Sequence, residues 1–269
     1  MRVFAVTLFL AAVAFSAFAD QDRPAALQSV GIDQRLNEQA PLDLIFRDET
    51  GRAVKLGDYF GDKPVILSLV YYECPMLCTL TLNGLVRSMR VLPFGVGERY
   101  AVVTVSFNPR ETSSLAAAKK KEYLAHYARP GGETGWHFLT GDESSIQKLT
   151  QAVGFHYNYD PQSGQFAHAT GLVILTPQGR IARYFYGVEF SPRDLRLALD
   201  EASANKIGSP VEAMLLFCFH YDPMTGKYGL IITRVIQLAG AGTVLALGGF
   251  MAVMLWRERR GKLRSAEAR

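Results

Sequence analysis

Cysteine is scarce in this 269-residue sequence, which contains only Cys74, Cys78 and Cys218. Three cysteines cannot all pair within one chain, so at least one thiol has a fate other than an intramolecular disulfide. The sequence also lacks a repeat of long period. It lacks the polarity of a disordered or collagen-like chain as well, because 49% of its residues are hydrophobic. We therefore expect a folded globular domain.

A large charge imbalance is absent too. Lys and Arg number 29 and Asp and Glu number 25, which gives a net charge of +4. The tail 257–269 contributes +4 of this and Arg2 a further +1, so residues 20–234 carry a net charge of −1. Such a domain has no basic surface for nucleic acid, and we expect no nucleic-acid partner.

The N-terminal residues have the pattern of a secretory signal peptide. A charged start and an uncharged apolar stretch lead to the small residues Ala17 and Ala19, which precede an acidic residue. This order predicts a signal peptide over residues 1–19, with an uncleaved anchor as the alternative. Residues 20–40 are polar and unpatterned, and we expect them to form a linker.

A second uncharged stretch lies near the C-terminus, at residues 235–256. As a helix with a rise of ~1.5 Å per residue it would cover the ~30 Å hydrocarbon core of a bilayer. Trp256 and the basic tail 257–269 resemble an interfacial aromatic residue and a cytoplasmic flank. We therefore predict a transmembrane helix at 235–256, a juxtamembrane segment at 207–234 and a cytoplasmic tail. A buried globular helix is the alternative.

Between these ends, apolar runs alternate with helical stripes. Strands buried on both faces are predicted at 64–72 and 101–107, and each precedes a helical pattern, at 79–92 and 112–127. We also expect a short hairpin at 42–46 and 53–56, a strand at 136–139, a helix at 142–153, an antiparallel hairpin at 172–175 and 181–185, and a final helix that begins at Ser191. This order predicts an α/β, thioredoxin-like domain over residues 41–206, with a central mixed sheet and flanking helices.

The motif Cys74-Pro75-Met76-Leu77-Cys78 lies directly between the strongest predicted strand and a helix. In an open α/β sheet this is the carboxyl edge, where ligands bind. The spacing of four places both sulfurs on one side of a helical turn, and the helix N-terminus favours the thiolate. Two thiolates suit a copper(I) or a zinc ion. A structural disulfide and thiol–disulfide exchange remain alternatives, although thioredoxin-type exchange usually has two residues between the cysteines.

A third ligand would distinguish a metal site from a redox pair, and His168 is the best candidate among the five histidines. It precedes the C-terminal hairpin, and in a thioredoxin-like fold that connection lies beside the loop that carries Cys74 and Cys78. Two thiolates and one imidazole leave a fourth position open and suit both oxidation states of copper. The other histidines are expected at surface or core positions or stay undecided.

A second soft-donor pair, Cys218 and His220, lies in the predicted juxtamembrane segment with Met224 nearby. It is either a metal site or partner contact, or a buried cysteine beside a stacked histidine. The apolar run 214–219 predicts that this segment packs against protein or lipid.

Over residues 41–206 the chain resembles the Sco/SenC family of copper-binding cytochrome c oxidase assembly proteins, which are thioredoxin-like. The matching features are Tyr72-Glu73-Cys74-Pro75-Met76-Leu77-Cys78, then Ser106-Phe107-Asn108-Pro109-Arg110-Glu111-Thr112, and His168 ahead of Leu172-Val173-Ile174-Leu175-Thr176-Pro177-Gln178-Gly179. The sequence departs from the family at Asn108, where an aspartate is common, and at Thr79, where proline is common. The predicted anchor also lies at the C-terminus instead of the N-terminus.

The resemblance implies that Cys74, Cys78 and His168 bind copper. It also implies that the protein delivers copper to the dinuclear centre of oxidase subunit II, or keeps its cysteines reduced. Its partner would be that subunit or another oxidase assembly factor. We expect a metallochaperone, not an enzyme, in the periplasm of a bacterium and anchored in the inner membrane. A thiol–disulfide oxidoreductase that uses Cys74 and Cys78 is the alternative, and a passive interaction module with a structural disulfide is a third.

Overall fold

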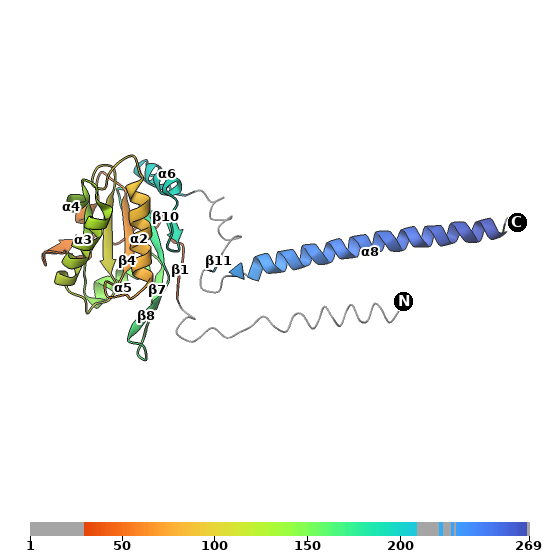
Figure 1. Cartoon of the computed structure of the whole chain (residues 1–269), viewed down its shortest axis with the longest axis horizontal. Helices are drawn as coiled ribbons and strands as arrows, with labels where there is room; N and C mark the ends of the chain where they lie inside the picture. The colour runs from red at the N-terminus through yellow and green to blue at the C-terminus, as the bar shows by residue number, and fades with distance from the viewer. Residues whose placement is uncertain (1–29, 209–220, 223–226, 229, 268–269) are drawn as a thin grey trace. The chain divides into compact units, whose positions relative to one another are not determined.

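The structure is a computed structural model that describes residues 30–208, 221–222, 227–228 and 230–267 (Figure 1). The chain divides into two units, Met1–Ile207 and Gly208–Arg269. The predicted signal peptide at 1–19 lies outside the described residues, as do Cys218, His220 and Met224.

The first unit is built on a five-stranded mixed sheet with the order β10-β9-β4-β5-β6. The central strand β4 (Val65–Val70) is buried along its whole length, as its continuous apolar run predicts. It pairs in parallel with β5 (Ala101–Ser106), which pairs in parallel with β6 (Trp136–Leu139). On its other side, β9 (Gly171–Leu175) runs antiparallel to β4 and to β10 (Ile181–Tyr186).

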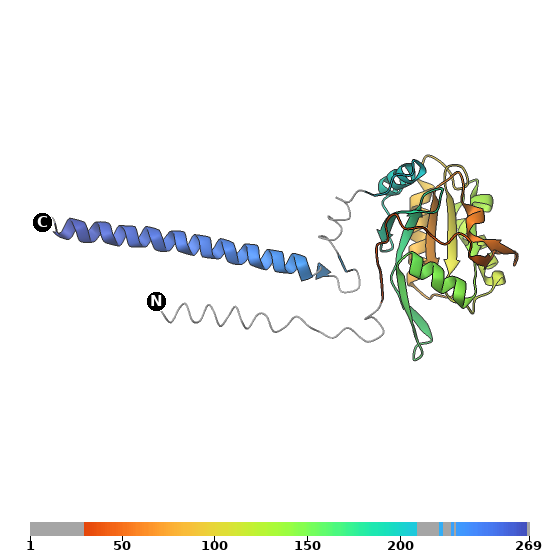
Figure 2. The same cartoon turned by 180° about the vertical axis from the view of Figure 1, so that it is seen from behind.

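Helices cover both faces of this sheet. In Figure 1, α2 (Leu77–Arg90) and α3 (Ser113–Tyr127) lie in front of the strands. Seen from behind, α5 (Glu143–Ala152) lies over the opposite face (Figure 2). The last helix of the unit, α6 (Pro192–Ser203), packs against α2, β9 and β10. A one-turn helix, α4 (Gly132–Gly135), precedes β6. The predicted thioredoxin-like α/β architecture is therefore confirmed for this unit.

The helix termini follow the local sequence signals. The Asp142 side chain accepts a hydrogen bond from Ser145 N at 2.7 Å and caps α5. Ser191 caps α6 in the same way, with proline at the first helical position. Gly154, which follows α5, has a φ of 68°, in the left-handed region that glycine adopts without strain.

Two smaller sheets flank the central one. The predicted N-terminal hairpin forms from β2 (Ile45–Arg47) and β3 (Ala53–Lys55) and continues into the 3-10 helix η3 (Leu56–Tyr59). A second sheet has the order β1-β7-β8. Its members are β1 (Gly31–Ile32), β7 (Phe155–Asp160) and β8 (Gln165–His168), and the β7–β8 hairpin projects beyond the central sheet (Figure 1). The sequence analysis missed this second sheet, although Phe155, Tyr157 and Tyr159 alternate with polar residues along β7, which is the period of a strand.

The predicted linker at 20–40 is corrected for its described part, because residues 30–40 belong to the domain. Strand β1 pairs with β7. Ala40 is buried, and its N–H donates to Gly179 O at 2.9 Å. Backbone pairing of this kind needs no apolar periodicity, so no sequence pattern indicates it. The domain begins before residue 41.

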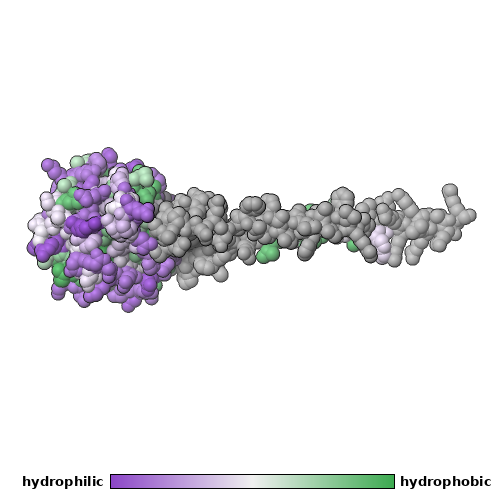
Figure 3. All heavy atoms as spheres, turned by 90° about the horizontal axis from the view of Figure 1, so that it is seen from below, coloured by the Kyte–Doolittle hydropathy of each residue, from purple (hydrophilic) through white to green (hydrophobic). Residues whose placement is uncertain are grey.

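One continuous hydrophobic core fills the space between the sheet and its helices. Its largest fully buried side chains include Trp136, Tyr100, Tyr123, Phe107 and Phe138. The face of this unit seen in Figure 3 is mainly hydrophilic, with a few small hydrophobic groups. Apolar surface is therefore concentrated inside, as expected for an independently folded domain.

The second unit contains the short antiparallel pair β11 (Tyr221–Asp222) and β12 (Lys227–Tyr228), followed by α8 (Leu230–Glu267). The segment predicted to cross the membrane, 235–256, is helical within α8. Among the residues that the structure describes, no helix is both long enough and apolar enough to span a bilayer. The transmembrane assignment is therefore not confirmed and stays a prediction.

Candidate metal centre

The two cysteines lie where β4 gives way to α2. A turn follows β4, and α2 begins at Leu77, so that Cys78 sits in its first helical turn. Backbone amides hold both sulfurs, since Cys78 N donates to Cys74 Sγ at 3.3 Å and Tyr71 N donates to Cys78 Sγ at 3.3 Å. Both thiols are free and buried. The predicted position of the motif at the carboxyl edge of the sheet is confirmed.

His168 reaches the cysteines from the other side of β4. It ends β8, just before β9 begins its antiparallel pairing with β4 near Ser68 and Leu172. That register brings the connection back to the end of β4. His168 Nε2 lies 3.5 Å from Cys78 Sγ, and the ligand atoms of Cys74, Cys78 and His168 all lie within 4.8 Å of one another. The predicted proximity of these three residues is confirmed.

The orientation of the His168 ring is fixed by its other nitrogen. Nδ1 lies 2.7 Å from Ala169 O. A carbonyl oxygen only accepts hydrogen bonds, so Nδ1 donates to Ala169 O, and Nε2 is the nitrogen that faces the sulfurs. A backbone partner on the outer nitrogen is typical of histidines that ligate metals.

The two thiols differ strongly in acidity. A hydrogen bond with the Cys78 side chain lowers the pKa of Cys74 to about 3, although burial acts in the opposite direction. Burial raises the pKa of Cys78, and its hydrogen bond with Cys74 and the charge of that sulfur raise it further. At neutral pH the reduced pair therefore holds one thiolate, at Cys74, and one thiol, at Cys78.

Aromatic rings enclose the histidine. The His168 ring centroid lies 5.2 Å from that of Phe107, 5.8 Å from that of Tyr71 and 6.4 Å from that of Phe155. Phe166 packs edge-on against Tyr71 and Phe107. His168 is only 4% exposed, whereas the neighbouring Met76 is 62% exposed. The centre is therefore a buried, water-poor site that approaches solvent on the side of the Cys74–Cys78 loop.

Two residues that support the cysteine loop were missed by the sequence analysis as functional candidates. The Tyr72 hydroxyl lies 2.7 Å from Leu139 O, and the Glu111 carboxylate accepts hydrogen bonds from Tyr72 N and Glu73 N. Glu111 follows the end of β5, at the same sheet edge as the cysteines. That position is a signal that could have identified it.

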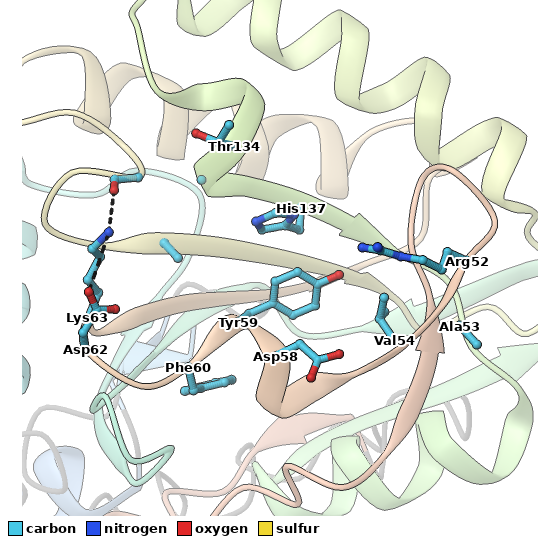
Figure 4. A pocket seen from close by; sticks show the side chains of 13 residues that line it. Arg52, Ala53, Val54, Asp58, Tyr59, Phe60, Asp62, Lys63, Thr134 and His137 are labelled. Carbon is cyan, nitrogen blue, oxygen red and sulfur yellow. Dashed lines mark hydrogen bonds and ion pairs between the residues drawn. The ribbon is translucent and has the colours of Figure 1, made fainter.

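The remaining described histidines lie apart from this centre. His126 is exposed on α3, and His156 pairs with Asp33 at 2.9 Å. The His137 ring packs against Tyr59 at the opposite, amino edge of the sheet, where both line a cavity of about 610 Å³ (Figure 4). Within the described residues, no other set of three His, Cys, Asp or Glu ligand atoms converges as Cys74, Cys78 and His168 do.

A mixed sheet with a cysteine pair at its carboxyl edge and a histidine facing that pair defines a thioredoxin-like protein with a soft-metal or dithiol centre. The family model described as SCO1/SenC matches residues 34–202, which is more than half of the chain. The chain therefore belongs to the SCO1/SenC family, as its motifs predict.

Solved structures show the same fold. A crystal structure from Aquifex aeolicus VF5, described as an electron transfer protein, is 26% identical with a TM-score of 0.57, and the match covers 64% of this chain and 95% of that one. BsSco, described as a member of the Sco family of cytochrome c oxidase assembly proteins, is 19% identical with a TM-score of 0.50, covering 65% and 99%. A ScoI from Arabidopsis thaliana, described as copper-bound, is 18% identical with a TM-score of 0.49, covering 60% and 96%. None of the curated proteins compared with the chain matches it.

Proposed function

We propose that this protein is a periplasmic, membrane-anchored copper chaperone for the assembly of cytochrome c oxidase, and that Cys74, Cys78 and His168 hold its cargo. The convergence of these three buried donors within 4.8 Å is the observation that carries the proposal. Membership of the SCO1/SenC family supports it.

The donor set fits copper in both of its oxidation states. Thiolates are soft ligands that suit copper(I), and imidazole suits copper(II). Cys74 is already a thiolate at neutral pH, and Cys78 would lose its proton when the metal binds. Because Nδ1 of His168 is engaged by Ala169 O, Nε2 is the nitrogen that would ligate the metal. Three protein ligands leave a position through which a partner can take the ion.

Metal analysis of the full-length protein tests this assignment. When the protein is purified with reduced thiols and loaded with copper(I), the wild type should hold about one copper ion per chain. Cys74→Ser and Cys78→Ser should each lose it. A wild-type protein that retains no more copper than the Cys74→Ser, Cys78→Ser double variant would refute the copper assignment.

The recipient we propose is the dinuclear copper centre of oxidase subunit II, reached directly or through another assembly factor. The resemblance to the Sco/SenC family supports this recipient. In cells that lack the gene, subunit II should accumulate with little copper, and wild-type protein should restore it whereas Cys74→Ser should not. Normal copper content of subunit II in the deletion strain would rule out this recipient.

The membrane anchor and the periplasmic location are proposed from the sequence. The uncharged stretch 235–256 and the basic tail 257–269 support a C-terminal anchor with the domain outside. Carbonate-washed membranes should retain the full-length protein, while a chain ending at Arg234 should appear in the soluble periplasmic fraction. Full-length protein in a soluble fraction would contradict the anchor.

A thiol–disulfide oxidoreductase is the second candidate, and the split acidity of the cysteines favours it. A thiolate at Cys74 beside a thiol at Cys78 is the state that attacks a partner disulfide. His168→Ala separates the two functions, because metal binding needs the imidazole and simple exchange does not. If respiration survives His168→Ala but fails with either cysteine variant, exchange is the function.

A further inference from the structure

Glu111 is a buried carboxylate that bridges two loops at the carboxyl edge of the sheet. It is 8% exposed and lies in the connection between β5 and α3. Its Oε2 accepts from Tyr72 N at 2.8 Å and from Ser106 Oγ at 2.5 Å, and its Oε1 accepts from Glu73 N at 2.9 Å. Three donors therefore converge on one side chain.

Two of these donors are the backbone amides immediately before Cys74. Glu111 thus holds the Tyr72 and Glu73 peptides, while the Tyr72 hydroxyl at the far end of the same residue lies 2.7 Å from Leu139 O. The chain that leads into Cys74 is held at its backbone by the β5–α3 connection and at the Tyr72 side chain by β6. A shift of that backbone would move the Cys74 sulfur relative to Cys78 and His168.

A carboxylate suits this position better than a neutral side chain. Both of its oxygens accept, so each backbone amide has a partner, whereas the amide group of a glutamine would turn an N–H toward one of the two donors. Burying a charged group costs free energy unless hydrogen bonds compensate for the lost hydration. A carboxylate therefore fits this position because it satisfies two loop amides at once.

We propose that Glu111 is a positioning residue of the Cys74, Cys78 and His168 centre: its bridging carboxylate fixes the Tyr72–Glu73 backbone and thereby the place of the Cys74 sulfur. This inference rests on the proposed copper-binding function for its metal readouts. It differs from a purely structural role, in which Glu111 would stabilise the fold without affecting the geometry at Cys74.

The test compares full-length wild-type protein with Glu111→Gln and with Ser106→Ala. Copper(I) affinity is measured by chelator competition, and copper(II) loading is followed by the sulfur-to-copper charge-transfer absorption. Loss of a partner that orients a ligand typically weakens metal binding by about 10–100-fold, and we expect Glu111→Gln to fall in this range and to shift the absorption. Ser106→Ala, which removes one hydrogen bond to Glu111, should shift both readouts in the same direction by less.

Asp48 provides a matched control. It is also a buried carboxylate that accepts from two backbone amides, Thr50 N at 2.9 Å and Arg52 N at 3.0 Å, but in the turn between β2 and β3. Asp48→Asn should lower the unfolding temperature and leave copper affinity and absorption unchanged. If Glu111→Gln leaves both copper readouts at wild-type values, or if Asp48→Asn changes them as much, Glu111 has no positioning role.

A metal-free readout keeps this inference separate from the copper proposal. In the reduced protein without metal, the ratio of alkylation rates at Cys74 and Cys78 should change in Glu111→Gln and stay constant in Asp48→Asn. A wild type that binds no copper would refute the proposed function alone. An unchanged alkylation ratio in both Glu111→Gln and Ser106→Ala would overturn the role of Glu111 whether or not copper binds.

Discussion

Both edges of the central sheet carry a histidine, but the side chains around it are arranged differently. At the carboxyl edge the ligand atoms converge, and among the described residues of the amino edge they do not. At the carboxyl edge, Cys74, Cys78 and His168 are buried and place their ligand atoms within 4.8 Å of one another. At the amino edge, His137 and Tyr59 line an open cavity of about 610 Å³ (Figure 4). The amino edge thus has a cavity beside a histidine but no set of converging donors among the described residues.

The polar groups of the amino edge are engaged with their own neighbours. The rings of His137 and Tyr59 pack at a tilt of 39° with their centroids 4.3 Å apart, and burial lowers the pKa of His137, which favours its neutral form. Lys63 Nζ donates to Gly97 O at 2.8 Å. A histidine beside a cavity is therefore not sufficient for a metal site. Convergent lone pairs on buried soft donors distinguish the carboxyl edge.

The largest difference in copper affinity should be between a variant that lacks a sulfur ligand at the carboxyl edge and a variant that lacks the histidine at the amino edge. Cys74→Ser removes a thiolate and should abolish copper(I) binding, whereas His137→Ala should leave copper stoichiometry and affinity at wild-type values. Both variants are measured by chelator competition on full-length protein. If His137→Ala lowers copper affinity as Cys74→Ser does, the two edges are not functionally distinct.

His168→Ala should have the next largest effect. Changing an outer partner of a ligand costs about 10–100-fold in metal affinity, so loss of the ligand itself should weaken copper binding by at least about 100-fold. His156→Ala is the matched control, since His156 lies in the same β7–β8 hairpin but pairs with Asp33. Equal copper affinities of the two variants would show that His168 is not a copper ligand.

The acidity of Cys74 predicts a distinct pH dependence for the reduced, metal-free protein. Its pKa of about 3 in the folded state lies below the ordinary thiol value, so the folded state holds the thiolate where the unfolded chain holds a thiol. Between these two pKa values the folded state binds fewer protons, and the free energy of unfolding should fall as pH decreases toward 3. The full contribution of the Cys74 thiolate to the free energy of unfolding is present only above the ordinary thiol pKa.

Denaturant unfolding of wild type and Cys74→Ser at several pH values measures this contribution. Carboxyl groups titrate in the same pH range, so the relevant quantity is the difference in free energy of unfolding between wild type and Cys74→Ser. It should shrink as pH falls from about 8 toward about 4. Alkylation of Cys74 should also stay nearly constant from about pH 8 to pH 5, where an ordinary thiol becomes unreactive. A tenfold loss per pH unit over that range would show that Cys74 has an ordinary pKa.

The sequence predicted those parts of the structure that local chemistry determines. The apolar run of β4, the caps at Asp142 and Ser191, and the placement of Cys74 and Cys78 at a strand-to-helix junction all follow from neighbouring residues. His168 was placed correctly because the order of strands fixes where the segment before β9 returns.

The parts that were missed depend on contacts between distant segments. Strand β1 exists because Gly31 and Ile32 pair with the backbone of β7, far along the chain. Glu111 takes its importance from amides 38 and 39 residues earlier. The aromatic rings around His168 come from Tyr71, directly after β4, from Phe107, directly after β5, and from the β7–β8 hairpin. No periodicity within any of these segments predicts such contacts.

The smallest effect on copper affinity should come from Arg110, which contacts the β7–β8 hairpin from the β5–α3 connection. Its guanidinium carbon lies 4.8 Å from the Tyr159 ring centroid and 5.9 Å from that of Phe166, both in the hairpin that ends at His168. An exposed cation–π contact contributes about 0.5–1 kcal/mol, which corresponds to an unfolding temperature about 1–4 °C lower in Arg110→Ala. Amide hydrogen exchange in residues 155–168 should become faster, and copper affinity should fall by less than about tenfold.

Arg193→Ala, at an exposed arginine of α6, is the control and should change neither hydrogen exchange in the hairpin nor copper affinity. If exchange in the hairpin is the same in both variants, Arg110 does not stabilise the segment that supplies His168.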